Sequence, residues 1–245
     1  MIRLVRNEWR KLHRERGLWF ALALHLAPWV MVTIAALMGV TAVGPRRYFI
    51  LHNQSMLVTG LVACTVTTIA FHVELANRTW FDWLTNPQGA TRLVLAKLTA
   101  IAAILISLLA LSTALTIGLM VCSGAGAGIF RMTVAYLTLQ CGTFAVMVAI
   151  SAALCVLTRN VVVVNIIGVA LGMVTMVVMG ADFSWAIPTA WPYRFGLTLL
   201  DQGYDYPWGG ALPSGAAVYA ACTVFALLIT VTCTRQPKVI NAPMR

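Results

Sequence analysis

Acidic residues are scarce in this chain. Its 245 residues include seven Asp and Glu against seventeen Lys and Arg, and all charged residues together make up 10% of the sequence. A water-soluble protein of this length exposes far more polar surface, so an ordinary soluble domain is excluded. The 60% share of apolar residues and the mean hydropathy of +0.87 indicate a membrane protein instead.

The sequence motifs of common catalytic and metal sites are also missing. The chain has no Gly-x-x-x-x-Gly-Lys-Ser/Thr, no His-Glu-x-x-His and no Gly-x-Ser-x-Gly. None of the seven acids lies well inside an apolar run, where an intramembrane enzyme needs them. The six cysteines show no paired spacing, and we expect them to pack as small apolar residues. We therefore predict that this chain is not an enzyme and holds no catalytic, cofactor or metal site.

Long apolar runs are what the chain has in quantity. About 20 apolar residues cross a bilayer, and backbone groups in lipid must bond within their own segment, so each run is expected to be a helix. Six such runs cover residues 18–43, 56–73, 98–122, 132–157, 161–181 and 216–234. We predict an all-α integral membrane protein with six transmembrane helices, forming one domain over residues 1–245.

The basic residues are unequally divided between the two sides that these spans define. With a cytoplasmic N-terminus, thirteen Lys and Arg fall on the inner side and four on the outer side, which together account for all seventeen. This positive-inside bias predicts that both termini are cytoplasmic. The net charge of +10 then reflects topology and attraction to anionic lipid, and not binding of nucleic acid.

The two ends of the predicted bundle carry amphipathic and aromatic segments. Residues 1–17 alternate apolar and basic positions with helical spacing, which predicts a helix lying in the inner interface; a plain basic tail is the alternative. The outer segment 182–213 holds four prolines and eight aromatic residues. Proline prevents one continuous helix, and Trp and Tyr prefer headgroup depth. We expect short helices around 191–200 that re-enter the outer leaflet, with an ordinary aromatic loop as the alternative.

Shorter signals predict how the helices pack. Only residues 158–160 join the fourth and fifth spans, so these two helices must be antiparallel neighbours. Gly168 and Gly172 form a Gly-x-x-x-Gly pattern that allows close approach of another helix. The polar stretch 52–55 is expected where the chain re-enters the membrane before the second span, substrate contact being the alternative.

The most distinctive segment, residues 74–92, joins the second and third spans. Glu74, Arg78 and Asp82 stand at i, i+4 and i+8, so on a helix they form a ladder of alternating charge. An adjoining apolar face and the end of the element are formed by Trp80, Phe81, Trp83, Leu84 and Pro87. Exposed rings at a cytoplasmic tip favour docking into a groove of a partner protein that transmits force; an interfacial anchor is the alternative.

Here the chain resembles the permease subunits of type-2 ATP-binding-cassette exporters, particularly the lantibiotic-immunity and peptide-antibiotic-resistance group. The architecture resembles that family over nearly the whole chain: a basic N-terminal helix, six spans, an inner loop after the second and re-entrant elements before the sixth. The local match comprises Glu74, the 80–84 coupling element, Pro87, Arg92 and Lys97. The outer residues that match the family's re-entrant segment include Pro188 and the stretch 191–195.

The resemblance implies a division of labour. The permease would have no ATPase of its own, so ATP and Mg²⁺ would bind a separate ATPase subunit, and a second copy or related permease would complete the path in a bacterial cell membrane. Spans with almost no charge favour amphipathic or lipophilic cargo such as a lantibiotic-like peptide. The cargo-side candidates are Trp185, Pro188, Trp191, Tyr193 and Phe195. The alternative is a non-transporting scaffold or sensor subunit.

Overall fold

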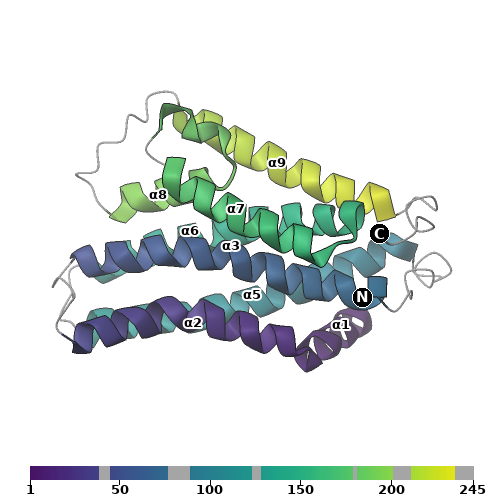
Figure 1. The fold of residues 1–245 in the computed structure, drawn as a ribbon, viewed down its shortest axis with the longest axis horizontal. Coiled ribbons are helices and arrows are strands. Elements are labelled where there is room, and N and C mark those ends of the chain that lie inside the picture. The colour runs from purple at the N-terminus through teal and green to yellow at the C-terminus, as the bar shows by residue number, and fades with distance from the viewer. Residues whose placement is uncertain (39–44, 77–88, 123–127, 179–180, 201–210, 235–245) are drawn as a thin grey trace.

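The computed structural model describes residues 1–38, 45–76, 89–122, 128–178, 181–200 and 211–234, and these residues form helices and no strand. Figure 1 shows the helices side by side, with their long axes in one general direction. In chain order they are α1 (Ile2–Arg14), α2 (Arg16–Leu37), α3 (Pro45–Ala76), α5 (Gly89–Cys122), α6 (Ile129–Thr158), α7 (Val161–Val178), the 3₁₀ helix η2 (Asp182–Ala186), α8 (Ala190–Leu200) and α9 (Ala211–Thr234).

Six of these helices are long and apolar enough to cross a membrane: α2, α3, α5, α6, α7 and α9. Their membrane-length segments agree with the six runs predicted from the sequence, apart from differences of several residues at the ends. The remaining described helices are short. α1 lies at one end of the bundle, and η2 and α8 lie at the other (Figure 1).

α3 begins before the predicted second span. The helix runs without interruption from Pro45 to Ala76, and its membrane-length segment begins at Asn53, so the polar stretch 52–55 lies where the chain enters that span, in agreement with the prediction. Its 32 residues span about 48 Å at 1.5 Å per residue, well beyond the hydrocarbon core. Proline suits the first position of a helix, because a backbone N–H at that position would have no acceptor within the helix, and proline has none to satisfy. The polar stretch therefore belongs to the first turns of a long helix, and Ser55 is buried within the bundle.

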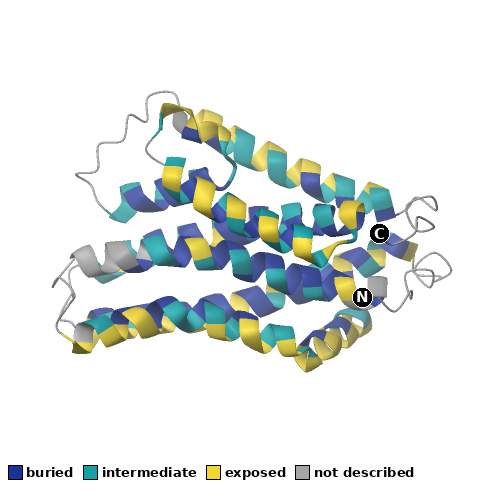
Figure 2. Ribbon diagram, viewed as in Figure 1, coloured by how far each residue is buried: buried dark blue, intermediate teal, exposed yellow. Residues whose placement is uncertain are grey.

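The pair α3 and α6 forms the centre of the bundle, and the buried residues of Figure 2 gather along it. Thr59 of α3 donates a hydrogen bond of 2.7 Å to the Gln140 side chain of α6. On the other side of the bundle, the Trp29 indole of α2 donates to Thr116 of α5 at 3.0 Å. Helices in lipid gain no hydrophobic driving force from packing, so such bonds and close contact hold them together.

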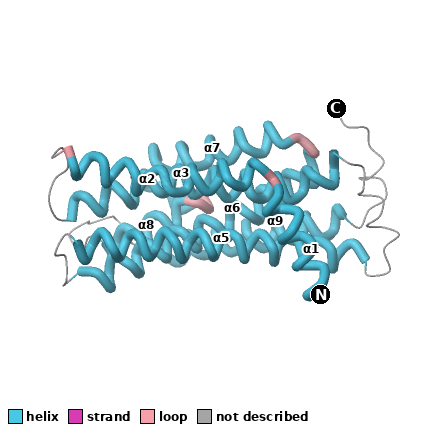
Figure 3. The backbone as a smooth tube through the Cα atoms, turned by 90° about the horizontal axis from the view of Figure 1, so that it is seen from below, coloured by secondary structure: helices cyan, strands magenta, loops and turns pink. Residues whose placement is uncertain are grey.

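Small residues allow the closest helix contacts, and the Gly-x-x-x-Gly prediction is confirmed. A Cβ at Gly168 of α7 would lie 2.4 Å from Cys64 Sγ, and one at Gly172 would lie 3.6 Å from the backbone oxygen of Leu57, both on α3. The tube view of Figure 3 shows α7 running alongside α3. α7 therefore packs against α3 through a glycine face.

The predicted tight connection between α6 and α7 is also present. α6 ends at Thr158 and α7 begins at Val161. Arg159 adopts the left-handed conformation with φ of 53°, which reverses the chain direction. Asn160 accepts hydrogen bonds from the backbone N–H groups of Val162 and Val163 at 2.9 and 3.3 Å, a side-chain cap that starts α7.

Candidate functional site: a buried ionic cluster

Four charged side chains from three helices meet at the end of the bundle that contains α1. We call Glu8 and Lys11 of α1, Glu74 of α3 and Lys97 of α5 the ionic cluster. Lys97 Nζ lies 2.6 Å from Glu8 Oε2 and 3.1 Å from Glu74 Oε1. Lys11 Nζ lies 2.8 Å from Glu8 Oε1 and 2.9 Å from Glu74 Oε1. Each lysine thus bridges both carboxylates, and two positive charges balance two negative ones.

The cluster is largely buried, most of all at its centre. Lys97 is 1% exposed, and Glu8 and Glu74 are 5% and 6% exposed. Lys97 also donates a hydrogen bond of 2.8 Å to the backbone oxygen of Ala70, one turn before Glu74 on α3. Buried charges are costly unless paired and hydrogen-bonded, and these short charge-assisted bonds satisfy that condition. The side chain of Lys11 is 48% exposed, so it closes the cluster from the solvent side.

The pairing keeps the α1 groups charged. Burial alone would raise the pKa of the Glu8 carboxyl, but Lys97 and Lys11 together hold that pKa below its usual 4.5. Burial alone would lower the pKa of Lys11, but its bonds to Glu8 and Glu74 hold that pKa above its usual 10.5. Both groups are therefore ionised at neutral pH, and α1 is attached to the bundle by charge as well as by the buried side chain of Leu12.

The cluster stands at both ends of the predicted coupling segment. Glu74 lies in the last turn of α3, which ends at Ala76, and Lys97 lies in the third turn of α5, which begins at Gly89. The coupling candidates between them lie outside the described residues: Arg78, Trp80, Phe81, Asp82, Trp83, Leu84 and Pro87. The predicted ladder from Glu74 to Arg78 and Asp82 thus stays a prediction, whereas the contacts of Glu74 with both lysines are observed.

Two of the cluster's residues were missed in the sequence, where the basic positions of 1–17 were treated only as an interfacial face. The available signal was Glu8 three residues before Lys11, an acid–base pair within an otherwise basic helix. The buried charges lie outside the six predicted spans: Lys97 stands one residue before the third span and is buried within α5, and Arg194 is buried within α8, which is not a span. Sequence alone shows how few charges there are, and says nothing of whether they gather.

At the opposite end of the bundle, the aromatic segment is divided as proline predicted. η2 ends at Ala186, Ile187 is extended, and α8 runs from Ala190 to Leu200. α8 lies close against α6, because a Cβ at Gly142 would lie 2.4 Å from Pro192 Cβ. The expected short helix around 191–200 is therefore present.

The five cargo-side candidates differ in accessibility. Tyr193 is fully buried and its hydroxyl donates to the Asn53 side chain of α3, which ties the polar stretch 52–55 to α8. Trp191 stacks on Phe195, with ring centroids 5.5 Å apart and planes 3° apart, and also contacts Tyr219 of α9. Pro188 is partly buried. Trp185 is 39% exposed, so it is the most accessible ring of the five.

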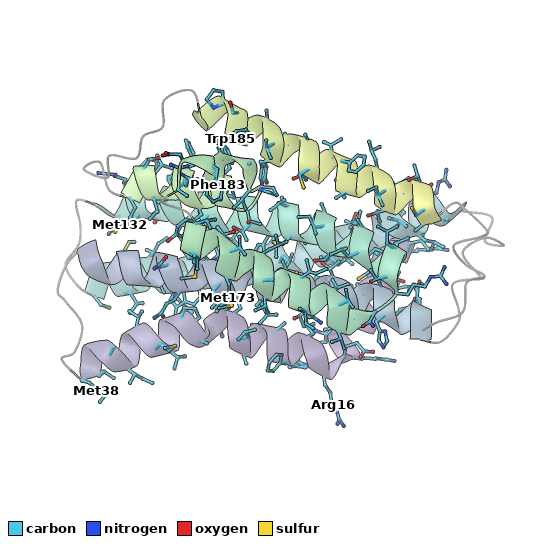
Figure 4. All side chains as sticks on the ribbon, turned by 45° about the horizontal axis from the view of Figure 1, so that its top comes forward. Arg16, Met38, Met132, Met173, Phe183 and Trp185 are labelled. Carbon is cyan, nitrogen blue, oxygen red and sulfur yellow. The ribbon has the colours of Figure 1, made fainter. Side chains whose placement is uncertain are left out.

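A neighbouring ring extends this exposed surface. Phe183, also on η2, is 59% exposed. Figure 4 shows Phe183 and Trp185 at the end of the bundle near the start of α9. Among the described residues 182–200, the most exposed rings are thus those of η2, while α8 packs against α6.

Six membrane-length helices, with the ionic cluster at one end of the bundle, define a polytopic membrane protein. Comparison with models of known protein families identifies the family: the family model described as ABC-2 family transporter protein matches residues 4–177. The match covers more than half of the chain, so this protein belongs to the ABC-2 transporter family. Searches of curated proteins and of solved structures gave no match.

Membership of the ABC-2 transporter family indicates the general role of this chain. An ABC-2 family protein is the membrane component of a transporter and is not itself the catalyst, and the family in general works with an ATP-binding-cassette ATPase. The matched range contains α1, the ionic cluster and the coupling segment. The outer segment 182–213 lies beyond it.

Proposed function

We propose that this chain is the transmembrane subunit of an ATP-driven exporter that removes amphipathic or lipophilic cargo from a bacterial cell membrane. A lantibiotic-like antimicrobial peptide is the cargo class we favour. ATP and Mg²⁺ bind the partner ATPase, and a second permease subunit, the same chain or a related one, completes the path. Both termini lie on the cytoplasmic side, where the ATPase meets the coupling segment.

The observation that carries this proposal is the ionic cluster. It joins α3 and α5, the two helices that enter and leave the coupling segment, and joins both of them to α1. A partner that displaces residues 77–88 would therefore move three helices as one unit. A segment that served only as a connection would need no four-residue charge network, with three of the four groups buried, between the helices on either side of it.

Two further features support lipophilic cargo. Phe183 and Trp185 present rings on the outer segment, where membrane-active peptides contact headgroups. A cavity of about 380 Å³ lies between α5, α6 and α9, and apolar side chains such as Leu105, Phe144 and Leu227 line it. Neither feature suits a small ion or a sugar.

The test compares cells that express this chain with an active ATPase against cells whose ATPase cannot hydrolyse ATP. The first should survive a higher concentration of a lantibiotic. Trp185→Ala should lower this protection more than it lowers basal ATP hydrolysis, because the exposed ring faces cargo. Tyr193→Ala serves as the matched control, because removing this buried ring should lower protein yield and both activities together.

Loss of both activities in Trp185→Ala at normal yield would mean that η2 has a structural role instead of a cargo role. If neither lantibiotics nor lipophilic drugs gave ATPase-dependent protection, the exporter proposal would fail. A complex that forms with the ATPase but transports nothing would then favour the scaffold or sensor alternative.

A further inference from the structure

A second cavity lies at the α1 end of the bundle, on the side of α1 away from the ionic cluster. Its volume is about 200 Å³, far above the roughly 30 Å³ that one water occupies in the liquid. It is lined by Trp9 and His13 of α1, by Leu18, Trp19 and Leu22 of α2, and by Ile104, Ser107 and Leu108 of α5. The exporter proposal does not use it.

The walls of this cavity suit a hydrocarbon chain. Leu18 and Leu22 are four residues apart on α2, as Ile104 and Leu108 are on α5, so the cavity follows both helices for about one turn, or 5.4 Å. Trp19 makes an edge contact with the His13 ring, with centroids 5.5 Å apart. Trp19 is also 54% exposed, as is typical of an aromatic ring at headgroup depth.

Helical spacing places two arginines of α1 close to residues that line this cavity. Arg6 precedes Trp9 by three residues and Arg10 precedes His13 by three, so each arginine lies one turn from a cavity-lining residue on the same side of α1. Both arginines are exposed. The nearby carboxylate of Glu8 is occupied by Lys11 and Lys97.

We propose that this cavity is a binding site for one anionic phospholipid of the leaflet on the α1 side. Part of an acyl chain fills the cavity between α2 and α5, and Arg6 and Arg10 bind the headgroup phosphate. Charge complementarity selects this occupant. A lipid with no net charge fills the apolar part equally well but gains less from the two arginines.

The test is native mass spectrometry of the purified full-length chain, offered equal amounts of dioleoyl phosphatidylglycerol and dioleoyl phosphatidylcholine at limiting concentration. The wild-type protein should retain phosphatidylglycerol, the anionic lipid, in preference to phosphatidylcholine. Arg6→Gln and Arg10→Gln should each lower that preference about fivefold, the effect of one basic residue near an anionic surface. Arg159→Gln removes a cation from the same end of the bundle, remote from the cavity, and should leave the preference unchanged.

A second pair of variants tests the acyl chain. Ser107→Phe fills the cavity and should lower retention of both lipids, whereas Ser107→Ala should retain them as the wild type does. Should Ser107→Phe fail to fold, the two exposed arginine variants still decide the question. The proposal is overturned if Arg159→Gln loses as much preference as Arg6→Gln. It is also overturned if Ser107→Phe folds and keeps its lipid, or if glycerol phosphate displaces the lipid at equal concentration.

Discussion

Replacing Lys97 by Met tests whether the ionic cluster anchors the bundle. The substitution keeps a long apolar side chain in α5 but removes an ammonium that is 1% exposed. Three short contacts are lost, to Glu8 at 2.6 Å, to Glu74 at 3.1 Å and to the backbone oxygen of Ala70 at 2.8 Å. Two buried carboxylates then share the single charge of Lys11.

Removal of one partner from a buried ion pair costs about 3–5 kcal/mol, mainly because the remaining charge is left uncompensated. We expect Lys97→Met to lower the free energy of unfolding by about 3 kcal/mol, the lower end of that range, since Lys11 still contacts both carboxylates. Lys11→Met is the matched control. Its side chain is 48% exposed, so its loss should cost about 1 kcal/mol or less.

The measurement is SDS-induced unfolding of the purified protein in mixed micelles, followed by tryptophan fluorescence. A double-mutant cycle that combines Lys97→Met with Glu8→Gln isolates the interaction between these two side chains. The double variant keeps the Lys11–Glu74 contact of 2.9 Å and leaves no uncompensated charge. Its cost should fall short of the sum of the single costs by about 1 kcal/mol or more. Equal costs for Lys97→Met and Lys11→Met, with an additive double variant, would refute the anchoring argument.

Three further predictions concern coupling, topology and pH. Trp80→Ala combined with Trp83→Ala should weaken assembly with the ATPase or uncouple its hydrolysis, because aromatic anchors often contribute about 2 kcal/mol at an interface; normal complex yield and transport would assign these rings to lipid. In a background without native cysteines, Gly126→Cys should react with an impermeant thiol reagent from outside and Gln88→Cys only after permeabilisation, and the reverse pattern would overturn the orientation. Because the pKa of Glu8 is lowered from 4.5, its stabilising effect is present above that pH and is lost as the pH falls through the folded-state value. Unfolding measurements should therefore show a decline in stability as the pH falls below 4.5 that is smaller in Glu8→Gln than in the wild type.

The spans could be predicted from the sequence because the bilayer sets their length and composition. The same constraint does not predict that α3 begins at Pro45, before the span that starts at Asn53, because a helix can extend beyond the hydrocarbon core and hydropathy does not mark its end. A tertiary contact of α3 could not be predicted either. Tyr193 of α8 donates to Asn53, 140 residues earlier in the chain, and that pairing has no local signature.

The ionic cluster could not be assembled from the sequence for a related reason. Lys97 is 89 residues from Glu8, and Lys11 is 63 residues from Glu74. Each residue has an acceptable local explanation, as a topogenic charge or as the end of a span, so periodicity gives no reason to pair them. Only the folded arrangement of α1, α3 and α5 shows that these few charges are concentrated at one place.

The composition of the cluster bears on its role. A site through which charged cargo passes needs groups that can exchange partners, but here two lysines and two carboxylates are already paired within 3.1 Å, and three of the four are buried. Release of any one of them leaves an unbalanced charge in a region of low dielectric. The cluster is therefore suited to stay closed while the parts attached to it move. In a transport cycle, α1, α3 and α5 should then move together as one unit, relative to helices that the cluster does not join, such as α9, the least buried of the six spans.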